Sequence, residues 1–144
     1  MKISEKGLQL IKEFEGYEGK AYLCPAGVWT IGYGHTQGVD ENDMCSVEEA
    51  SEFLKKDVEK AERAVSELVK HELNQNQFDA LVSFVFNLGR DRFRQSSLLK
   101  FLNSAHFPLA GGQFDRWIYA DGKVMQGLVK RRAAEKALFL EPMQ

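Results

Sequence analysis

The stretch from residue 27 to residue 36 reads Gly27-Val28-Trp29-Thr30-Ile31-Gly32-Tyr33-Gly34-His35-Thr36. Its β-branched and aromatic residues are typical of a strand, which we predict over residues 28–33. The preceding Pro25-Ala26-Gly27 is typical of a turn, because proline presets φ and glycine tolerates a positive φ. This region therefore predicts a small β-hairpin or sheet near the N-terminus.

Helical patterns lie on both sides of the predicted hairpin. Ser4 can cap a first helix whose apolar residues fall at helical spacing and which ends at Gly16. After residue 45 the pattern is helical throughout. Ser46-Val47-Glu48-Glu49 fits a capping box at the start of a long helix. The apolar residues of that helix recur on one face: Phe53, Leu54, Val58, Ala61, Val65 and Leu68.

The C-terminal part of the chain predicts a helical bundle. Residues 78–88 are apolar on nearly every side and are followed by Gly89, which favours a central, buried helix. Shorter helices are expected over residues 97–102 and 109–118, and a final one over residues 128–140. We therefore predict one α+β, mostly α-helical domain over residues 1–144. It has an N-terminal lobe of about residues 12–60 with the β-hairpin, and a helical C-terminal lobe of about residues 61–144 plus the first helix. The long helix joins the two lobes, and a ligand site is expected in a cleft between them.

Composition and charge exclude several classes of protein. The net charge of −2 argues against a general nucleic-acid binder. Two basic clusters, Arg90/Arg92/Arg94 and Lys130/Arg131/Arg132/Lys136, either face an anionic polymer or are ordinary solvated helix faces. Two cysteines are too few for a disulfide scaffold. Because residues 1–6 lack the apolar run of a signal peptide, we expect synthesis in the cytoplasm with reduced thiols.

Three residues of the N-terminal region could carry chemistry. Glu15, beside Phe14 at the end of the first helix, is either a general acid or a solvated glutamate. Thr30 either holds a water molecule or is an ordinary strand residue. His35 is a poor metal ligand candidate because no Cys, His or Asp lies at ligand spacing from it, which leaves an acid or an ion-pair partner.

The segments Phe14-Glu15-Gly16, Lys20-Ala21-Tyr22 and 27–36 together resemble the signature of the phage lysozymes of glycoside hydrolase family 24. Two further blocks, residues 76–89 and 127–135, resemble the same family, so the resemblance covers essentially the whole chain in order. It implies the two-lobed lysozyme-like fold. It also implies a muramidase that hydrolyses the β-1,4 bond between N-acetylmuramic acid and N-acetylglucosamine in peptidoglycan, with no metal and no organic cofactor.

The family's catalytic pattern is Glu, eight residues, Asp or Cys, five residues, Thr, which falls on Glu15, Cys24 and Thr30. The resemblance implies that Glu15 is the general acid and that Thr30 positions the attacking water. Cys24 stands where aspartate is more usual. It is a thiolate base, a thiolate nucleophile or a mostly passive residue, and we favour the base that positions water because the family mostly inverts.

Matching the other blocks to the family gives supporting residues and a biological setting. His35 is expected to pair with Asp57 in a structural role, and Arg131, or else Arg132, is expected near Glu15. The resemblance implies an endolysin for phage-induced host lysis, with peptidoglycan glycan strands as partner. We expect a monomer that has no nucleic-acid partner and no membrane anchor. It would remain in the host cytoplasm until a holin releases it to the periplasm and cell wall.

Two other readings stay open from the sequence. The chain could be a wall-binding module that has lost activity, with Cys24 marking the lost step. It could also be a lytic transglycosylase, which needs a glutamate and no water-activating partner. Product analysis separates the three, because only hydrolysis gives a reducing-end sugar and only transglycosylation gives an anhydro-sugar.

Overall fold

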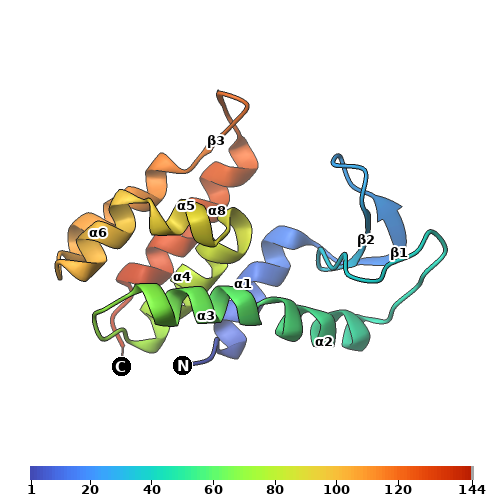
Figure 1. Cartoon of the computed structure of the whole chain (residues 1–144), viewed down its shortest axis with the longest axis horizontal. Coiled ribbons are helices and arrows are strands. Elements are labelled where there is room, and N and C mark those ends of the chain that lie inside the picture. Colours follow the sequence, from blue (N-terminus) through green and yellow to red (C-terminus); the bar gives the residue numbers. More distant parts are fainter. Residues whose placement is uncertain (144) are drawn as a thin grey trace. The chain divides into compact units, whose positions relative to one another are not determined.

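The computed structural model describes residues 1–143 and divides into two compact units. We call residues 11–59 the hairpin unit, and residues 1–10 together with those from residue 60 onward the helical unit. The division falls inside helix α1 (Glu5–Glu15) and after the first residue of helix α3 (Glu59–Leu68). Figure 1 shows α1 and the strands β1 and β2 in the blue part of the chain, and the other helices in the green to red part.

The hairpin unit is built on two antiparallel strands, β1 (Glu18–Leu23) and β2 (Trp29–Gly32). The loop between them is closed by hydrogen bonds from the Gly27 N–H to the Cys24 carbonyl (2.8 Å) and from the Cys24 N–H to the Val28 carbonyl (3.0 Å). Gly27 has a φ of 77°, the left-handed conformation that follows the turn in three-residue hairpin loops. The predicted turn and strand are therefore confirmed.

Helix α2 (Val47–Asp57) packs on the hairpin and starts with the predicted capping box. The Ser46 hydroxyl accepts from the Glu49 N–H, and the Glu49 carboxylate accepts from the Ser46 N–H. Toward its C-terminus the ring of Phe53 stacks on His35, with ring centroids 4.3 Å apart. This aromatic contact holds α2 to the segment that follows β2.

The single long helix expected after residue 46 is wrong, because the structure has two helices separated by Val58. The Val58 N–H still bonds to the Leu54 carbonyl, but its ψ of −12° is shallower than the α-helical value. Val58 is buried like its apolar neighbours in the pattern. The apolar spacing therefore runs through the interruption unchanged, so the pattern could not reveal it.

Helix α4 (Gln75–Leu88) is the core of the helical unit, as predicted. The ring of Phe84, which is fully buried, makes edge contacts with the rings of Phe93, Phe114 and Trp117. The last helix α8 (Gln126–Leu140) packs on α4, the shorter helices α6 (Ser97–Asn103) and α7 (Phe107–Gln113) pack on each other, and the short η1 (Phe114–Arg116) contacts α8.

Two elements of the helical unit were not predicted. One is the short helix α5 (Arg90–Arg94), and the other is a hairpin of β3 (Tyr119–Ala120) and β4 (Lys123–Val124). The helix expected over residues 109–118 instead consists of α7 and η1 and ends at Arg116. Asp121 and Gly122 both have positive φ, 52° and 75°, which is the geometry of the two-residue turns that Asp-Gly favours.

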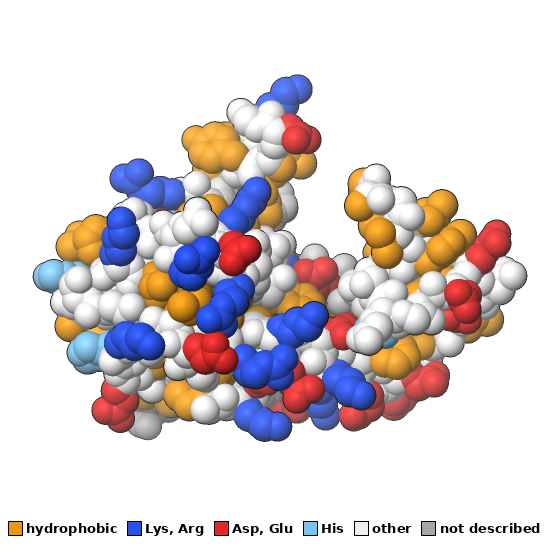
Figure 2. Space-filling model, viewed as in Figure 1, with side chains coloured by type: hydrophobic (Ala, Val, Ile, Leu, Met, Phe, Trp, Pro, Cys, Tyr) orange, Lys and Arg blue, Asp and Glu red, His pale blue; other side chains and the backbone are white. Residues whose placement is uncertain are grey.

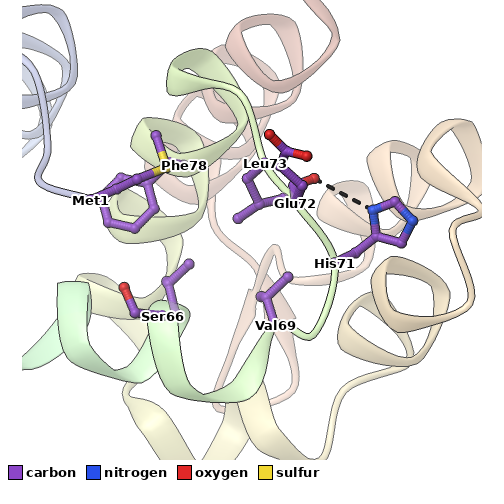
Figure 3. A pocket seen from close by; sticks show the side chains of 8 residues that line it. Met1, Ser66, Val69, His71, Glu72, Leu73 and Phe78 are labelled. Atoms are coloured by element: carbon purple, nitrogen blue, oxygen red, sulfur yellow. Dashed lines mark hydrogen bonds between the residues drawn. The ribbon is translucent and has the colours of Figure 1, made fainter.

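A pocket of about 350 Å³ lies in the helical unit beside Met1 (Figure 3). Its lining is mostly apolar and includes Val65, Val69 and Phe78. None of the site residues that the sequence predicts lines this pocket. Among the helices of residues 1–143, none has both the length and the apolar character needed to cross a membrane.

Candidate active site in the hairpin unit

Glu15 is the last residue of α1, and its carboxylate lies against the loop that follows β2. That loop is closed by reciprocal hydrogen bonds of 2.9 Å between the backbones of Ile31 and His35. Gly34 lies in the loop with a φ of 82°, and a Cβ atom built on it would be 3.0 Å from Oε1 of Glu15. A side chain at position 34 would therefore push the carboxylate by a few tenths of an ångström, and glycine also suits the positive φ.

Cys24 directly follows β1 at the start of the tight loop, and its sulfur lies among hydrogen-bond donors. The N–H groups of Val28 and Ala26 and, more weakly, the Thr30 hydroxyl hold the pKa of the Cys24 thiol below its usual value, against an opposing contribution from desolvation. Donors that converge on a side chain in this way favour its anionic form. The position therefore suits a carboxylate or a thiolate, the two anions that the family pattern allows there.

Thr30 lies in β2 on the same face of the hairpin as Cys24 and is 4% exposed. Its hydroxyl donates to the Val28 carbonyl, with 3.0 Å between the oxygens, and it also lies within hydrogen-bond reach of the Cys24 sulfur. A hydroxyl has one proton, so it can donate to only one of these acceptors at a time. Thr30 can thus turn toward the sulfur when the thiol loses its proton.

The phenol of Tyr22 lies close enough to both Glu15 and Cys24 to feel the charge of each. Burial is the largest cause that raises the pKa of Tyr22. The nearby charges of Glu18, Cys24 and Glu15 raise this pKa further, in decreasing order of effect. Glu15 and Cys24 therefore both act on one side chain, although they come from a helix and a hairpin loop. The hairpin unit alone holds Glu15, Cys24 and Thr30.

His35 and Asp57 lie in the hairpin unit as an ion pair, with Nδ1 of His35 2.8 Å from Oδ2 of Asp57. Because the His35 ring also stacks on Phe53, both contacts hold the hairpin onto α2. Cys45 is buried, and its carbonyl accepts a hydrogen bond of 2.7 Å from the Tyr17 hydroxyl. Both cysteines are free thiols in the structure.

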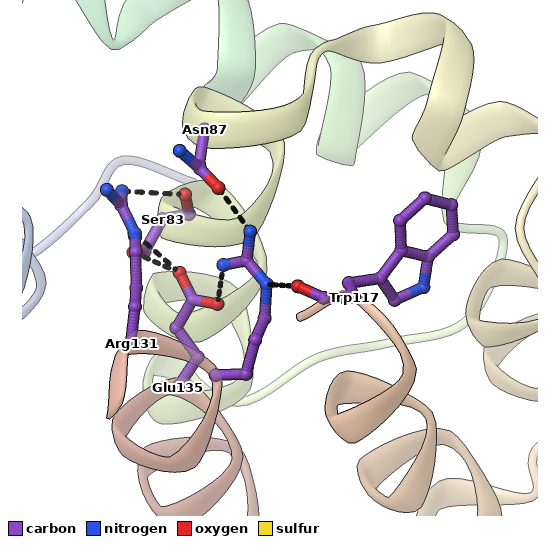
Figure 4. Close-up of polar contacts among 6 residues, drawn as sticks. Ser83, Asn87, Trp117, Arg131 and Glu135 are labelled. Atoms are coloured by element: carbon purple, nitrogen blue, oxygen red, sulfur yellow. Dashed lines mark hydrogen bonds and ion pairs between the residues drawn. The ribbon is translucent and has the colours of Figure 1, made fainter. Parts of the chain in front are cut away.

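Arg131 and Arg132 belong to the helical unit and are buried against α4 (Figure 4). Glu135, which has no solvent exposure, accepts hydrogen bonds from Nε of Arg131 at 3.2 Å and Nη1 of Arg132 at 2.6 Å. Nε of Arg132 also donates to the Trp117 carbonyl at 2.9 Å. The third acceptor of Arg132 is the side-chain oxygen of Asn87, which is bonded by Nη2. The interpretation of residues 130–136 as one solvated basic face is therefore wrong for these two arginines.

The two units carry opposite charge. The hairpin unit has four basic and eleven acidic residues, a net charge of −7, and the rest of the chain has fifteen basic and ten acidic residues, a net charge of +5. Figure 2 shows many blue side chains over the helical unit and mostly red ones over the hairpin unit. The overall charge of −2 conceals this asymmetry.

Sequence reasoning missed the groups that hold the site residues in place. The N–H groups of Ala26 and Val28 carry no side-chain signal, and their convergence on Cys24 depends on the loop type. Glu135 could have been found, because an acidic residue three and four positions after two arginines is placed to pair with both. The close approach of Gly34 to Glu15 had no signal beyond the glycine itself.

Comparison with known proteins places this chain in a family. Residues 12–135 match the phage lysozyme family. The endolysin of Acyrthosiphon pisum secondary endosymbiont phage 1 is 47% identical over 143 residues, which covers 96% of this chain and 98% of the relative. The endolysin of Salmonella phage P22 is 43% identical over 145 residues, covering 97% and 99%. The muramidase domain of SpmX from Asticaccaulis excentricus superposes with a TM-score of 0.93 at 43% identity, covering 98% of this chain and 99% of that domain.

The chain therefore belongs to the phage lysozyme family. It is a lysozyme-type glycoside hydrolase of the endolysin class, and the predicted mostly helical, lysozyme-like fold is confirmed.

Proposed function

We propose that this enzyme cleaves the β-1,4 bond between N-acetylmuramic acid and N-acetylglucosamine by hydrolysis, with Glu15, Cys24 and Thr30 as its catalytic residues. The observation that carries the proposal is the anion-binding environment of Cys24 beside Thr30, in the same unit as Glu15 and at the family's spacing. Muramidase activity is named for the SpmX domain, and the two phage relatives are named endolysins.

Glu15 acts as the general acid. Its proton moves to the glycosidic oxygen while the bond from that oxygen to the anomeric carbon breaks, so the leaving sugar departs as an alcohol. The loop around Gly34 fixes the carboxyl group, which supports this role because general acid catalysis requires a positioned donor.

Cys24 acts as the base for the attacking water. A thiolate accepts a proton from the water, the water oxygen bonds to the anomeric carbon, and the proton later returns to solvent as Glu15 is reprotonated. The N–H groups of Val28 and Ala26 support this role, because they stabilise the thiolate before the reaction. Thr30 holds the same water, with its hydroxyl oxygen as acceptor. A thiolate nucleophile would use the same environment but would form a covalent glycosyl–enzyme intermediate.

The remaining roles follow the family pattern. Arg131 is proposed as a supporting cation for Glu15, and His35 with Asp57 as the structural pair of the hairpin unit. We propose one domain with an N-terminal lobe over about residues 12–60, and we propose that it acts as a monomer without a cofactor. In host lysis the enzyme would accumulate in the cytoplasm until a holin lets it reach peptidoglycan in the wall.

Product analysis tests the proposal. Purified peptidoglycan is digested with the wild-type enzyme, and the soluble fragments are reduced with borohydride and identified by mass. Hydrolysis adds one water per cleaved bond and leaves a reducible end, which is the expected result. Anhydro-sugars would instead indicate a lytic transglycosylase. If no fragment is released while the protein sediments with the wall, the chain is a wall-binding module and the proposal is wrong.

A further inference from the structure

Tyr22 has a defined place beside the proposed catalytic residues. It lies in β1 directly opposite Thr30 in β2, and Leu23 lies opposite Trp29. Side chains alternate between the two faces of a strand, and directly opposed residues share a face. Tyr22 and Thr30 therefore share one face of the hairpin with Cys24, and Leu23 and Trp29 share the other.

The ring of Tyr22 is accessible, in contrast to the threonine beside it. Tyr22 is 40% exposed and Thr30 is 4% exposed. Directly opposed side chains in an antiparallel pair have their Cβ atoms about 4.5–5.5 Å apart. Tyr22 thus stands next to Thr30 and offers an aromatic surface to any molecule that reaches Thr30.

No contact within the described part of the fold requires a hydroxyl group on Tyr22. Tyr17, on the same hairpin unit, donates its hydroxyl proton to the Cys45 carbonyl, and its ring contacts the ring of Tyr33. Within residues 1–143, the Tyr22 hydroxyl has no hydrogen-bond partner in the protein and its ring contacts no other aromatic ring. Burial and then the charges of Glu18, Cys24 and Glu15 raise the pKa of Tyr22, so the phenol keeps its proton at neutral pH and can donate it.

We propose that Tyr22 is a substrate-binding residue for the sugar that carries the scissile bond. Its ring packs against the C–H face of that sugar, and its hydroxyl donates a hydrogen bond to one of the sugar's oxygens. Aromatic side chains with a polar tip suit a ligand that is apolar on one face and polar at its edge. The inference rests on the proposed function, because it places the reacting sugar beside Thr30 and Cys24.

The test compares three variants with the wild type on soluble peptidoglycan fragments of defined length. Tyr22→Phe removes only the hydroxyl, and Tyr22→Ala removes the ring as well. Leu23→Ala is the matched control, because Leu23 is the next residue, is 55% exposed and lies on the opposite face. The values of KM, kcat and the thermal unfolding midpoint are measured for each protein.

We expect Tyr22→Phe to raise KM about threefold to tenfold, as the loss of one hydrogen bond does. Tyr22→Ala should raise KM by roughly tenfold or more, with a smaller change in kcat, and Leu23→Ala should stay within about twofold of the wild type. Because Tyr22 is half exposed, all three should unfold close to the wild-type midpoint. Because Tyr22→Phe retains the ring, it tests the role of the hydroxyl even if Tyr22→Ala folds poorly.

The inference is overturned if Tyr22→Ala binds and cleaves as Leu23→Ala does, or if kcat falls while KM is unchanged. Failure of the proposed function is a separate result. It would be seen in the wild type itself, as the absence of any reducing-end product.

Discussion

The carboxylate of Glu15 rests against the backbone of Gly34, so closely that a Cβ atom on Gly34 would lie 3.0 Å from Oε1. Two features favour glycine at this position. One is the close approach of the carboxylate, and the other is the φ of 82°, which is disfavoured for other residues. The contact joins the end of α1 to the loop after β2. The position of the Glu15 carboxylate is thereby fixed by the loop that leads into His35. The His35 ring is in turn held by Asp57 and Phe53.

Substitution of Gly34 by alanine should reduce activity much more than stability. The methyl group displaces the carboxylate by a few tenths of an ångström or more, and displacement of a positioned catalytic group costs about tenfold to a hundredfold in rate. The rate of peptidoglycan cleavage and the thermal midpoint are measured together.

Gly38→Ala is the control for Gly34→Ala. Gly38 has a φ of 72°, and a Cβ atom on it would meet nothing within 4 Å. Both variants should lose roughly 1 kcal/mol of stability from the left-handed backbone. Equal activity in the two variants would show that the approach to Glu15 has no catalytic importance.

The pH dependence of the reaction rate should follow the ionisation of the Cys24 thiol. A thiolate base is present only above the pKa of the thiol, so activity rises as pH increases through that pKa. Hydrogen bonds from Val28 and Ala26 lower the pKa of Cys24, so the midpoint should lie below the ordinary thiol value of about 8.5. With Cys24→Asp the rise should move toward the carboxylate range near pH 4.

Cys24→Ala completes the pH experiment, since alanine has neither an ionisable group nor a nucleophile. We expect at least a hundredfold loss of rate, in the range of other general bases. If Cys24→Ala keeps the wild-type pH profile and rate, the thiol is passive and water is activated without it.

The buried charges around Glu135 should dominate the stability of the helical unit. Glu135 binds Arg131, Arg132 and the Ser83 hydroxyl, with 2.5 Å from the hydroxyl to the carboxylate. Replacing it with alanine leaves buried guanidinium groups without their carboxylate, which typically costs about 3–5 kcal/mol. The thermal midpoint should fall by roughly 10 °C, as measured by circular dichroism.

Asp115→Asn is the comparison for Glu135→Ala, because Asp115 pairs with Lys136 at 2.7 Å on the surface. Exposed ion pairs contribute about 0–1 kcal/mol, so the midpoint should change by a few degrees at most. A large loss in both variants, or in neither, would contradict the account of Glu135.

Binding to the wall should depend on ionic strength through the helical unit, whose net charge is +5. Charge reversal of the exposed Arg92 should weaken sedimentation of a Glu15→Gln protein with anionic peptidoglycan several-fold at low salt, with little effect at high salt. The same reversal at Lys55 of the acidic hairpin unit should matter less. A larger effect at Lys55 would assign wall binding to the hairpin unit instead.

The hairpin and most helices were predictable because their signals are local. The turn at Pro25-Ala26-Gly27, the capping box at Ser46 and the apolar run before Gly89 each lie within a few residues, and the structure has all three. The break at Val58 was not predictable, because a buried valine satisfies the helical pattern on either side. The β3–β4 hairpin was missed because two-residue strands are too short to show alternation.

The catalytic candidates were named from the family pattern, because the residues alone left an ordinary role open for Glu15 and Thr30 and did not single out Cys24. What the sequence could not supply is the backbone chemistry around them. Two N–H groups converge on Cys24 because Gly27 closes a particular loop, and the carboxylate of Glu15 lies where a side chain at Gly34 would displace it. Such contacts depend on three-dimensional position and cannot be predicted from composition or residue spacing.

The role of Glu15 as the general acid is tested by comparing Glu15→Gln with Glu13→Gln. Both residues lie in α1 and the change is the same, but Glu13 is exposed two positions earlier on the helix. Release of reducing ends from purified peptidoglycan is measured for both variants and the wild type at equal concentration. We expect a loss of roughly a thousandfold for Glu15→Gln, because glutamine has no acidic proton to donate to the leaving oxygen, and wild-type activity for Glu13→Gln. Wild-type activity in a correctly folded Glu15→Gln protein would contradict the role of Glu15 as the general acid.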